Sequence, residues 1–567
     1  MRRLVRSSAW LLLIVASCGD DVDSQGGLGD ASIPDAAVSL DSGAADASGD
    51  GIDAGGFADA RPSELDAAPT GMVIASIQTA DGYTQVRQGS TYANGSAVDL
   101  VIAGERLAAV TSVTVGELAT SLEDVTDGEV RVRLPVPHAA PPGPREVTVR
   151  SPGEVVAVAG AIEVTPYVVA PSASAAGRGT FQSPMTICND QVRRSRSGDT
   201  ILLLEGAHRC SQSRIWLEEG GQIFQGQGVA VTALGVPGDG FHGFDMRPSD
   251  PETVTTFRDL TITSAVDGPT IRLWDRGSLL VERVALDGPG ISLGNCSDCE
   301  TQATIREASF TSSRIDASGR ARFAVFDSTF TQGGACVRTT GGQFTVMNTR
   351  FESCSIGVLL EKGDPSSEAV RGEILDSVFV DNQTGVKQRA GWLAVADTSI
   401  RQTAGSSGPF DRGIHINGGE LEATRVTIAG HGAAGIEAFV SAAEVDSARV
   451  TLADVLVEGG QYGVYLHGSS EGGGLFMRSS IVRDQTVAAV SLGFARAVRH
   501  DLNGNNTLSV VSGVALDDAR VDPIFRTIEA AGMTLNGKSY TGLVDGPAEL
   551  LPDYRIVDDR GLIEFSP

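Results

Sequence analysis

A short segment recurs about every 24 residues through the C-terminal two thirds of the chain. Each copy places a large apolar residue among polar ones, as in LTITSA, STFTQG, TRFESC and SVFVDN. The recurring apolar residues are Ile262, Leu286, Phe310, Phe330, Phe351, Phe379, Ile400, Ile428, Val457 and Val482. A repeat of this kind predicts stacked units, each of which buries its apolar face only against its neighbours.

A second apolar segment follows most copies and begins with glycine or alanine plus an aliphatic residue. These pairs are Gly357-Val358, Gly385-Val386, Gly413-Ile414, Gly435-Ile436, Gly463-Val464 and Ala489-Val490. Several short strands per repeat, at a period near 24, predict the coils of a parallel β-helix with strands about 4.8 Å apart. A β-propeller would need blades of about 40–50 residues with hairpin signals, and the repeat has neither.

The segment before the repeat, residues 171–208, reads as an entry element. Ser183-Pro184 is a favoured helix start, so we expect a short helix to about Arg194, and then a strand at Thr200–Leu204. The order GTFQSP, helix, GDTILLLEG resembles the entry of right-handed parallel β-helix proteins of the pectin-lyase-like family. That resemblance implies that the helix covers the open end of the first coil.

The region upstream, residues 71–166, has short alternating runs separated by glycine and proline, such as VDLVIAG, VTSVTVG and GPREVTVRSPG. This pattern is typical of all-β domains. The order of the runs resembles the TIG immunoglobulin-like domain, which implies a β-sandwich used as a spacer or binding module. The predicted fold is therefore all-β. We expect an Ig-like sandwich, a right-handed parallel β-helix over 171–515 with an N-terminal capping helix, and a C-terminal cap over 516–567.

The N-terminus reads MRRLVRSSAWLLLIVASC, a basic start and a short apolar stretch typical of a secretory signal. Val15-Ala16-Ser17-Cys18 resembles the lipobox of bacterial lipoproteins. The resemblance implies a signal peptide over 1–18, lipidation of Cys18, and membrane attachment at the outer membrane or cell surface. Residues 19–70 carry twelve acidic residues against the single base Arg61. That composition predicts a disordered acidic tether.

The net charge of −27 argues against nucleic acid or anionic lipid headgroups as partners. Six cysteines follow Cys18: Cys188, Cys210, Cys296, Cys299, Cys336 and Cys354. An even number in an exported protein suggests disulfides, and pairing of sequence neighbours is the simplest of fifteen connectivities. The CSDC segment could also be half of a zinc site, but no second ligand pair stands at a recognisable spacing, so we expect no metal and no cofactor.

Gly430-His431-Gly432 matches a triplet that polygalacturonases carry in their active site. The other elements of that family's pattern, Asn-x-Asp, Asp-Asp and Arg-Ile-Lys, are missing from the coils around His431, so the resemblance implies the fold and not the activity. We interpret the triplet as a glycine-rich turn. Asp327, Asp376, Asp397 and Asp454 recur just before the large apolar residue, and we interpret them as turn residues rather than calcium ligands, as pectate lyases would use.

The strands that begin at the glycine pairs carry the candidate site. Alternate residues along a strand point outward, which predicts a stripe over successive coils containing Lys387, Arg389, His415, Asn417, Glu437, Phe439, Tyr465 and His467. Aromatic faces beside hydrogen-bonding groups suit a sugar chain. We expect an extended ligand, a polysaccharide or another envelope component, and a binding protein rather than an enzyme. The alternatives are a polysaccharide lyase or hydrolase using Glu437 and the histidines, and a purely structural or adhesive rod.

Overall fold

The computed structural model describes residues 71–563, with gaps at 91–96, 175, 211–214, 218, 237–242, 249, 251, 265–267, 295–298, 364–368, 404–407, 441–447, 469–473, 495–499, 503–504, 513, 519–527, 530–532, 536–537, 541–542, 545–553 and 559–560. All of the described residues belong to one compact unit, 69–567. The predicted signal peptide with Cys18 and the predicted tether over 19–70 lie outside the described residues. No helix in the described ranges is long and apolar enough to cross a membrane.

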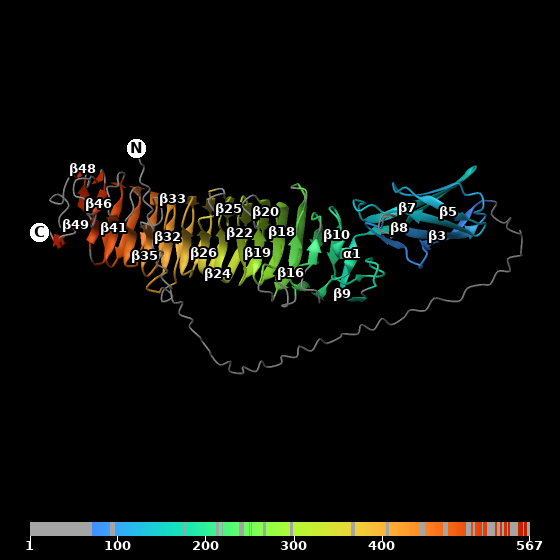
Figure 1. Cartoon of the computed structure of the whole chain (residues 1–567), viewed down its shortest axis with the longest axis horizontal. Coiled ribbons are helices and arrows are strands. Elements are labelled where there is room, and N and C mark those ends of the chain that lie inside the picture. The colour runs from blue at the N-terminus through green and yellow to red at the C-terminus, as the bar shows by residue number, and fades with distance from the viewer. Residues whose placement is uncertain are drawn as a thin grey trace, which may run out of the picture. The chain divides into compact units, whose positions relative to one another are not determined.

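The N-terminal domain is a β-sandwich of two four-stranded sheets (Figure 1). One sheet has the order β1 (Val73–Thr79), β3 (Val98–Glu105), β6 (Glu129–Leu134) and β5 (Ser121–Val125); the other has β2 (Gln85–Arg87), β8 (Glu154–Thr165), β7 (Gly143–Ser151) and β4 (Ser112–Val115). Alternate residues, such as Leu100 and Ile102 on one sheet and Val147 and Val149 on the other, are fully buried in one shared core. The alternation in the sequence therefore predicted the sandwich correctly.

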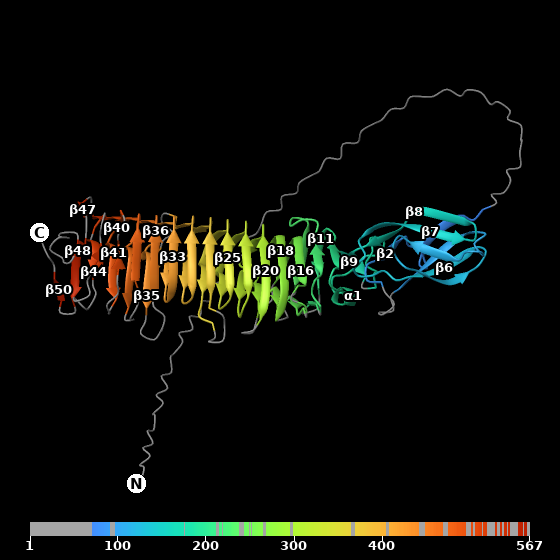
Figure 2. The ribbon, with the colours of Figure 1, turned by 90° about the horizontal axis from the view of Figure 1, so that it is seen from above.

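The rest of the described chain is a parallel β-helix, as predicted, with three strand positions in each coil (Figures 1 and 2). We name the three resulting sheets A, B and C, in the order in which each coil visits them. Sheet A contains β9 (Tyr167–Ser174), β10 (Thr200–Leu203), β13 (Ile223–Gln225), β20 (Glu300–Arg306), β23 (Arg322–Phe326), β25 (Gln343–Met347), β27 (Arg371–Leu375), β30 (Trp392–Ala396), β33 (Gly419–Thr424), β36 (Ala448–Ala453), β39 (Gly474–Arg478) and β42 (His500–Asp501).

Sheets B and C complete each coil. Sheet B contains β11 (Gly206–Arg209), β14 (Thr232–Val236), β21 (Ser309–Thr311), β28 (Val378–Val380), β31 (Ser399–Arg401), β34 (Thr427–Ala429), β37 (Leu456–Glu458), β40 (Ile481–Gln485) and β43 (Thr507–Val510). Sheet C contains β12 (Ile215–Leu217), β15 (Phe244–Met246), β17 (Ile271–Leu273), β19 (Gly290–Leu293), β22 (Arg314–Ala317), β29 (Thr384–Gln388), β32 (Arg412–Ile416), β35 (Ala434–Val440), β38 (Tyr462–Gly468), β41 (Ala488–Phe494) and β44 (Val514–Asp518).

Four longer strands pass through two sheets each. β16 (Val254–Ser264) and β18 (Arg276–Asp287) run through A and B, and β24 (Thr329–Thr339) and β26 (Arg350–Leu360) run through B and C. The C-terminal strands are β45 (Ile528–Glu529), β46 (Met533–Leu535), β47 (Lys538–Tyr540), β48 (Leu543–Val544), β49 (Tyr554–Asp558) and β50 (Gly561–Ile563). β45, β46 and β49 continue the parallel pairing with the preceding coil, and antiparallel pairs such as β46 with β47 are added to it.

The core of the β-helix is built on the recurring apolar residues of sheet B. All ten lie at most 1% exposed in a single continuous core. Phe310, Phe330, Phe351 and Phe379 are stacked, with ring centroids 4.4, 5.0 and 4.6 Å apart in that order. The spacing of the strands sets this distance, since neighbouring strands lie about 4.8 Å apart.

The recurring aspartates are turn residues, as predicted. Asp327, Asp376, Asp397 and Asp454 each stand between sheets A and B with φ of 48–55°. This left-handed conformation is one that Asp and Asn tolerate better than other side-chain-bearing residues. One such residue per coil lets the chain bend sharply between two strands, so these positions are explained by the backbone.

The glycines that begin the strands of sheet C are required by the core. A Cβ at Gly413 would lie 2.4 Å from Cγ2 of Ile428, and one at Gly435 would lie 2.2 Å from Cγ1 of Val457. The large apolar residue on sheet B therefore fills the space beside each glycine. Each glycine packs against the large apolar residue of the following coil, which explains why both signals recur together along the repeat.

Two of the predicted disulfides are present. Cys188 pairs with Cys210, and Cys336 with Cys354. Cys188–Cys210 joins the entry segment to the first coil, whereas Cys336–Cys354 joins two successive coils at the step from sheet B to sheet C. The third predicted pair falls partly outside the described residues, because Cys296 is not among them.

The prediction of a helix starting at Ser183-Pro184 is wrong. The helix α1 covers only Asp190–Arg193, and its cap is Asn189, whose side chain accepts a hydrogen bond from the Gln191 amide. The segment after Pro184 is extended instead, because Met185 is fully buried and forms a parallel bridge with Val169. Tertiary packing thus outweighs a favourable local helix signal.

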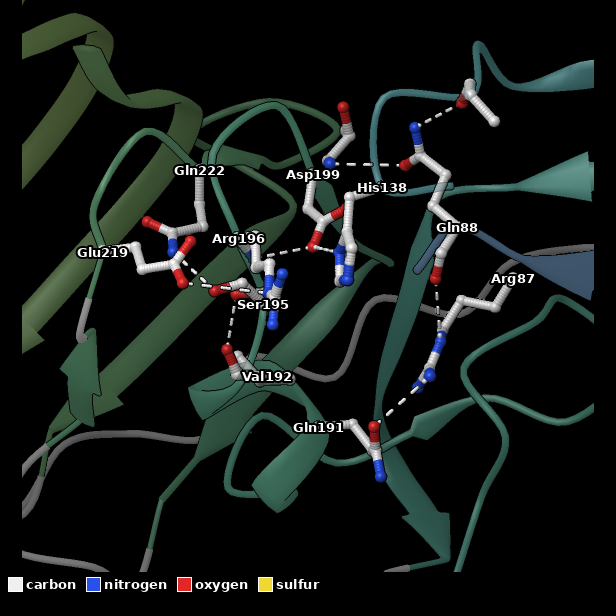
Figure 3. A network of polar contacts seen from close by, with 12 residues as sticks. Arg87, Gln88, His138, Gln191, Val192, Ser195, Arg196, Asp199, Glu219 and Gln222 are labelled. Carbon is white, nitrogen blue, oxygen red and sulfur yellow. Dashed lines mark hydrogen bonds and ion pairs between the residues drawn. The ribbon is translucent and has the colours of Figure 1, made fainter. Parts of the chain in front are cut away.

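The sandwich continues into the β-helix with only Pro166 between β8 and β9. Figure 3 shows the polar contacts across this junction. His138 of the sandwich contacts Asp199 of the first coil, with Nδ1 to Oδ2 at 2.6 Å, and the Arg196 amide donates to the same oxygen at 2.7 Å. Burial raises the pKa of Asp199. The buried Asp199 carboxylate is bonded by His138 of the sandwich and by the Arg196 amide of the β-helix. The two domains are therefore joined by a specific polar contact and not by a linker alone.

Candidate functional site

The predicted stripe lies on the outer face of sheet C, over β29, β32, β35 and β38. Lys387, His415, Glu437 and Tyr465 occupy equivalent positions in the register of these parallel strands. The remaining four residues lie two positions further along each coil and are Arg389, Asn417, Phe439 and His467. Phe439 and His467 are equivalent in the register of β35 and β38. The structure therefore brings all eight residues onto one face in two rows, as the sequence predicted.

Glu437 is at the centre of this face and is only 8% exposed. Arg412, at the start of β32, donates from Nε to one carboxylate oxygen, and His467 Nε2 lies 2.9 Å from the other. Arg412 also donates from Nη1 to the Phe410 carbonyl at 2.7 Å, which fixes its side chain. Arg412 is a member of the site that sequence reasoning missed, because it stands just before the glycine that was used to mark the strand.

Aromatic rings surround the histidine. The Tyr465 ring is stacked on His467 with centroids 4.1 Å apart and an interplanar angle of 8°, and Tyr462 is stacked on Tyr465 at 4.4 Å. Phe439 lies 4.8 Å from His467, tilted by 47°, and is 37% exposed. These rings place apolar surface directly beside the hydrogen-bonding groups of the site.

Both histidines of the site are neutral at pH 7. Burial, followed by the positive charges of Arg412 and Lys387, lowers the pKa of His415 to about 3. Burial and then Arg412 lower the pKa of His467 to about 4. A neutral imidazole can donate a hydrogen bond from one nitrogen and accept one at the other, so His467 can donate to Glu437 through Nε2 and keep Nδ1 as an acceptor.

Ion pairs occupy the same face one to three coils before this cluster. Glu361 pairs with Arg338 at 2.6 Å and with Arg389 at 2.9 Å, and Arg338 approaches Asp316 at 3.5 Å. Burial raises the pKa of Asp316. Acids and bases compensate one another in this part of sheet C, so the face as a whole is not strongly charged.

A second aromatic cluster lies on sheet C near the N-terminal end of the β-helix, and sequence reasoning missed it. The Arg247 guanidinium lies 4.8 Å from the Trp216 ring centroid and 4.4 Å from that of Trp274, and Arg272 lies 3.6 Å from Trp274. The Trp274 indole donates to Asp245, which is 1% exposed. The alternation in IWL, FDMR and IRLWD could have revealed the cluster, but these coils precede the regular part of the repeat.

The Gly-His-Gly triplet is a turn between β34 and β35, as interpreted from the sequence. Gly430 has φ of +78°, and a Cβ at Gly432 would lie 2.1 Å from the Gly408 carbonyl oxygen. His431 is 2% exposed, and burial lowers its pKa to about 4. Its side chain is thus part of the packed turn and does not reach the outer face.

Within the described ranges, no three His, Cys, Asp or Glu side chains are grouped so that they could hold a metal ion. No family model matches the sequence, and no curated protein matches it with significant similarity.

Three of the similar solved structures act on polysaccharides according to their names. A mutant of a periplasmic alginate epimerase, AlgG, is 11% identical, with 57% of this chain and 78% of that chain covered and a TM-score of 0.27. Pectate lyase Pel9A is 12% identical, with 66% and 81% covered and a TM-score of 0.25. A rhamnogalacturonan lyase is 12% identical, with 63% and 87% covered and a TM-score of 0.22. Likenesses of this size leave the function to be inferred from the side chains.

Proposed function

We propose that the outer face of sheet C binds an extended polysaccharide over β29, β32, β35 and β38. The observation that carries the proposal is the partly exposed Phe439 ring beside the stacked rings of Tyr465 and His467. The Glu437 carboxylate lies directly next to them and contacts His467. Aromatic faces pack against the C–H face of a sugar ring, and neighbouring polar groups bond its hydroxyls.

The register of the strands gives the ligand its direction. Lys387 and Tyr465 are three strand spacings apart, about 14 Å. A chain lying across the coils would meet a new pair of outward side chains at every spacing. An extended polymer uses such a surface better than a small molecule does, because the polar and aromatic groups are spread along a line rather than gathered in a pocket.

A second candidate function is cleavage or modification of the same polysaccharide. A neutral histidine hydrogen-bonded to a carboxylate is a usable acid–base pair, and His467 and Glu437 form one at 2.9 Å. Glycoside hydrolysis ordinarily needs two converging carboxylates, whereas Glu437 is the one acid among the eight residues of the stripe. An elimination reaction, which needs a single proton acceptor, therefore fits this cluster better than hydrolysis does.

One set of variants tests both functions. Phe439→Ala combined with Tyr465→Ala should lower the affinity for a bound glycan at least about tenfold, since two stacking surfaces are lost. Phe181→Ala, which removes a 43% exposed ring from the entry segment, should leave the affinity unchanged. Binding is measured on a glycan array and then by calorimetry. Absence of wild-type binding above background would support a purely structural rod instead.

Turnover is followed on the same panel of polysaccharides. If the protein is an enzyme, Glu437→Gln should abolish the formation of product, because the amide cannot accept or deliver a proton at the same position. Equal and measurable turnover by wild type and Glu437→Gln would remove Glu437 from the reaction. No turnover on any member of the panel would leave binding as the function.

We also propose that the protein is an exported lipoprotein attached through Cys18, with the sandwich serving as a TIG-like spacer. The lipobox-like Val15–Cys18 supports the anchor. The two disulfides support an oxidising compartment, because disulfides rarely persist in the cytosol. Metabolic labelling with a fatty acid should tag the wild type and not Cys18→Ser. Equal labelling of the two would exclude this anchor.

A further inference from the structure

A groove of about 800 Å³ runs along sheet A, a different sheet from the one that carries the proposed polysaccharide site. It crosses β16, β18, β20, β23, β25, β27 and β30. These seven strands lie in parallel register, so the groove extends over six strand spacings, about 29 Å. Figure 2 shows several of these strands side by side.

Two rows of side chains shape the groove. One row contains Gln302, Arg322, Gln343, Arg371 and Trp392, which are equivalent in the register. The row beside it contains Thr304, Ala324 and Thr345. The hollow follows from this difference in size, because long side chains stand next to short ones over three successive coils.

The arginines of the groove differ from those of sheet C. The Arg322 and Arg371 side chains make no ion pair or hydrogen bond with any residue in the described ranges, and both residues are exposed. They are two strand spacings apart, about 9.6 Å. Arg306, also in the lining, is held by Glu282 at 2.5 Å, and Glu373 is the acidic residue of the lining. On a chain with a net charge of −27, this is a local excess of positive charge.

We propose that this groove is a second carbohydrate site, which binds an extended anionic polysaccharide. Arg322 and Arg371 each bind a carboxylate of the ligand, since the guanidinium fork matches a carboxylate in two hydrogen bonds. Gln302 supplies amide groups for hydroxyls, and the half-buried Trp392 offers a ring at one end of the groove. If both sites are used, the proposed site on sheet C, where acidic and basic side chains compensate each other, binds a different part of the same polymer or a different polymer.

The same features disfavour other polymers. A peptide cannot add to this sheet as an extra strand, because β20, β23, β25, β27 and β30 are paired on both sides. The floor of Thr304, Ala324 and Thr345 offers no deep apolar pocket for a helix or an aromatic anchor. Nucleic acid carries a far denser row of charges and would be repelled by the rest of this acidic chain.

The test uses oligogalacturonate, its methyl ester of the same length, and other acidic oligosaccharides built on glucuronate or mannuronate. Binding is measured by calorimetry at low salt. We expect at least one acidic oligomer to bind, the neutral ester to bind at least about tenfold more weakly, and affinity to fall as salt is added. Arg322→Gln and Arg371→Gln should each weaken binding of the acidic oligomer about tenfold, because each removes a charge-assisted contact.

Two control variants separate this groove from the rest of the molecule. Arg401→Gln removes an exposed arginine from sheet B and should leave the affinity unchanged. In a Phe439→Ala and Tyr465→Ala background, which disables the proposed site on sheet C, Arg322→Gln should still weaken binding of the acidic oligomer about tenfold, so the two sites can fail separately. Circular dichroism confirms that each variant is folded.

The proposal is overturned if no acidic oligosaccharide binds the wild type, or if the combined Arg322→Gln and Arg371→Gln variant binds as tightly as the wild type. It is also overturned if a poly-glutamate peptide binds at the arginines more tightly than every acidic sugar, because the groove would then recognise acidic peptides.

Discussion

Phe351→Ala is expected to lower the free energy of unfolding by about 3–5 kcal/mol, the usual cost of removing a buried aromatic ring. Phe351 is fully buried, with Phe330 on one side at 5.0 Å and Phe379 on the other at 4.6 Å. Its removal leaves a cavity in the middle of the column and breaks two stacking contacts. Urea unfolding followed by circular dichroism measures the change.

Phe410→Ala is the matched control, since this phenylalanine is 68% exposed and its loss should change stability by less than about 0.5 kcal/mol. Because each coil contacts only its neighbours, Phe351→Ala should also make unfolding less cooperative, since it separates the two halves of the array. A loss below about 1 kcal/mol for Phe351→Ala would mean that the column contributes little to stability.

The second large effect is a loss of stability in mild acid. Burial lowers the pKa values of His415 to about 3 and of His431 and His467 to about 4, against 6.5 for an exposed histidine. Between pH 6.5 and 4 the unfolded chain therefore binds protons that the folded chain does not. Stability must fall as the pH is lowered through this range. At pH 5 the loss is about 2 kcal/mol for each of His415 and His431, and less for His467, which is better solvated and lies 2.9 Å from the Glu437 carboxylate.

Substitution of single histidines isolates the effect from that of the carboxylates. His431→Leu removes the titrating group from the turn, and His467→Gln removes it from sheet C while keeping a polar side chain. Between pH 6.5 and pH 5, the loss of unfolding free energy should be about 1.6 kcal/mol smaller in His431→Leu than in the wild type, and smaller by a lesser amount in His467→Gln. Denaturant titrations at several pH values give this slope. An unchanged slope in both variants would show that these histidines titrate normally in the folded protein.

The fold was predictable from the sequence because certain positions in each coil accept only one type of residue, for reasons of packing. The column from Ile262 to Val482 must be apolar, and the glycines at 413 and 435 must be glycine because Ile428 and Val457 occupy the adjacent space. The rows of sheet C were predictable for a related reason, since alternation places every second residue of a strand outward.

Other features had no such signal. The helix start at Ser183 was locally plausible, but the burial of Met185 against the first coil is decided by tertiary packing. The groove on sheet A depends on where short side chains such as Ala324 fall beside long ones such as Arg322. The hollow needs this pairing of long and short side chains to recur in successive coils, at steps of about 20 to 28 residues along the chain, and no local motif marks that recurrence. The role of Arg412 likewise required a contact across strands, to Glu437.

The strand-by-strand register of sheet A has a consequence for how such a surface can change. Arg322 and Arg371 are separated by one intervening strand, which carries Gln343. Inserting or deleting a whole coil would move the two charges apart or together by about 4.8 Å, and no smaller step keeps the parallel register. The distance between the charges on this surface can therefore change only in steps of one strand spacing. A related chain could match a polymer with a different charge spacing by counting coils, while every residue that packs inside a coil stays the same.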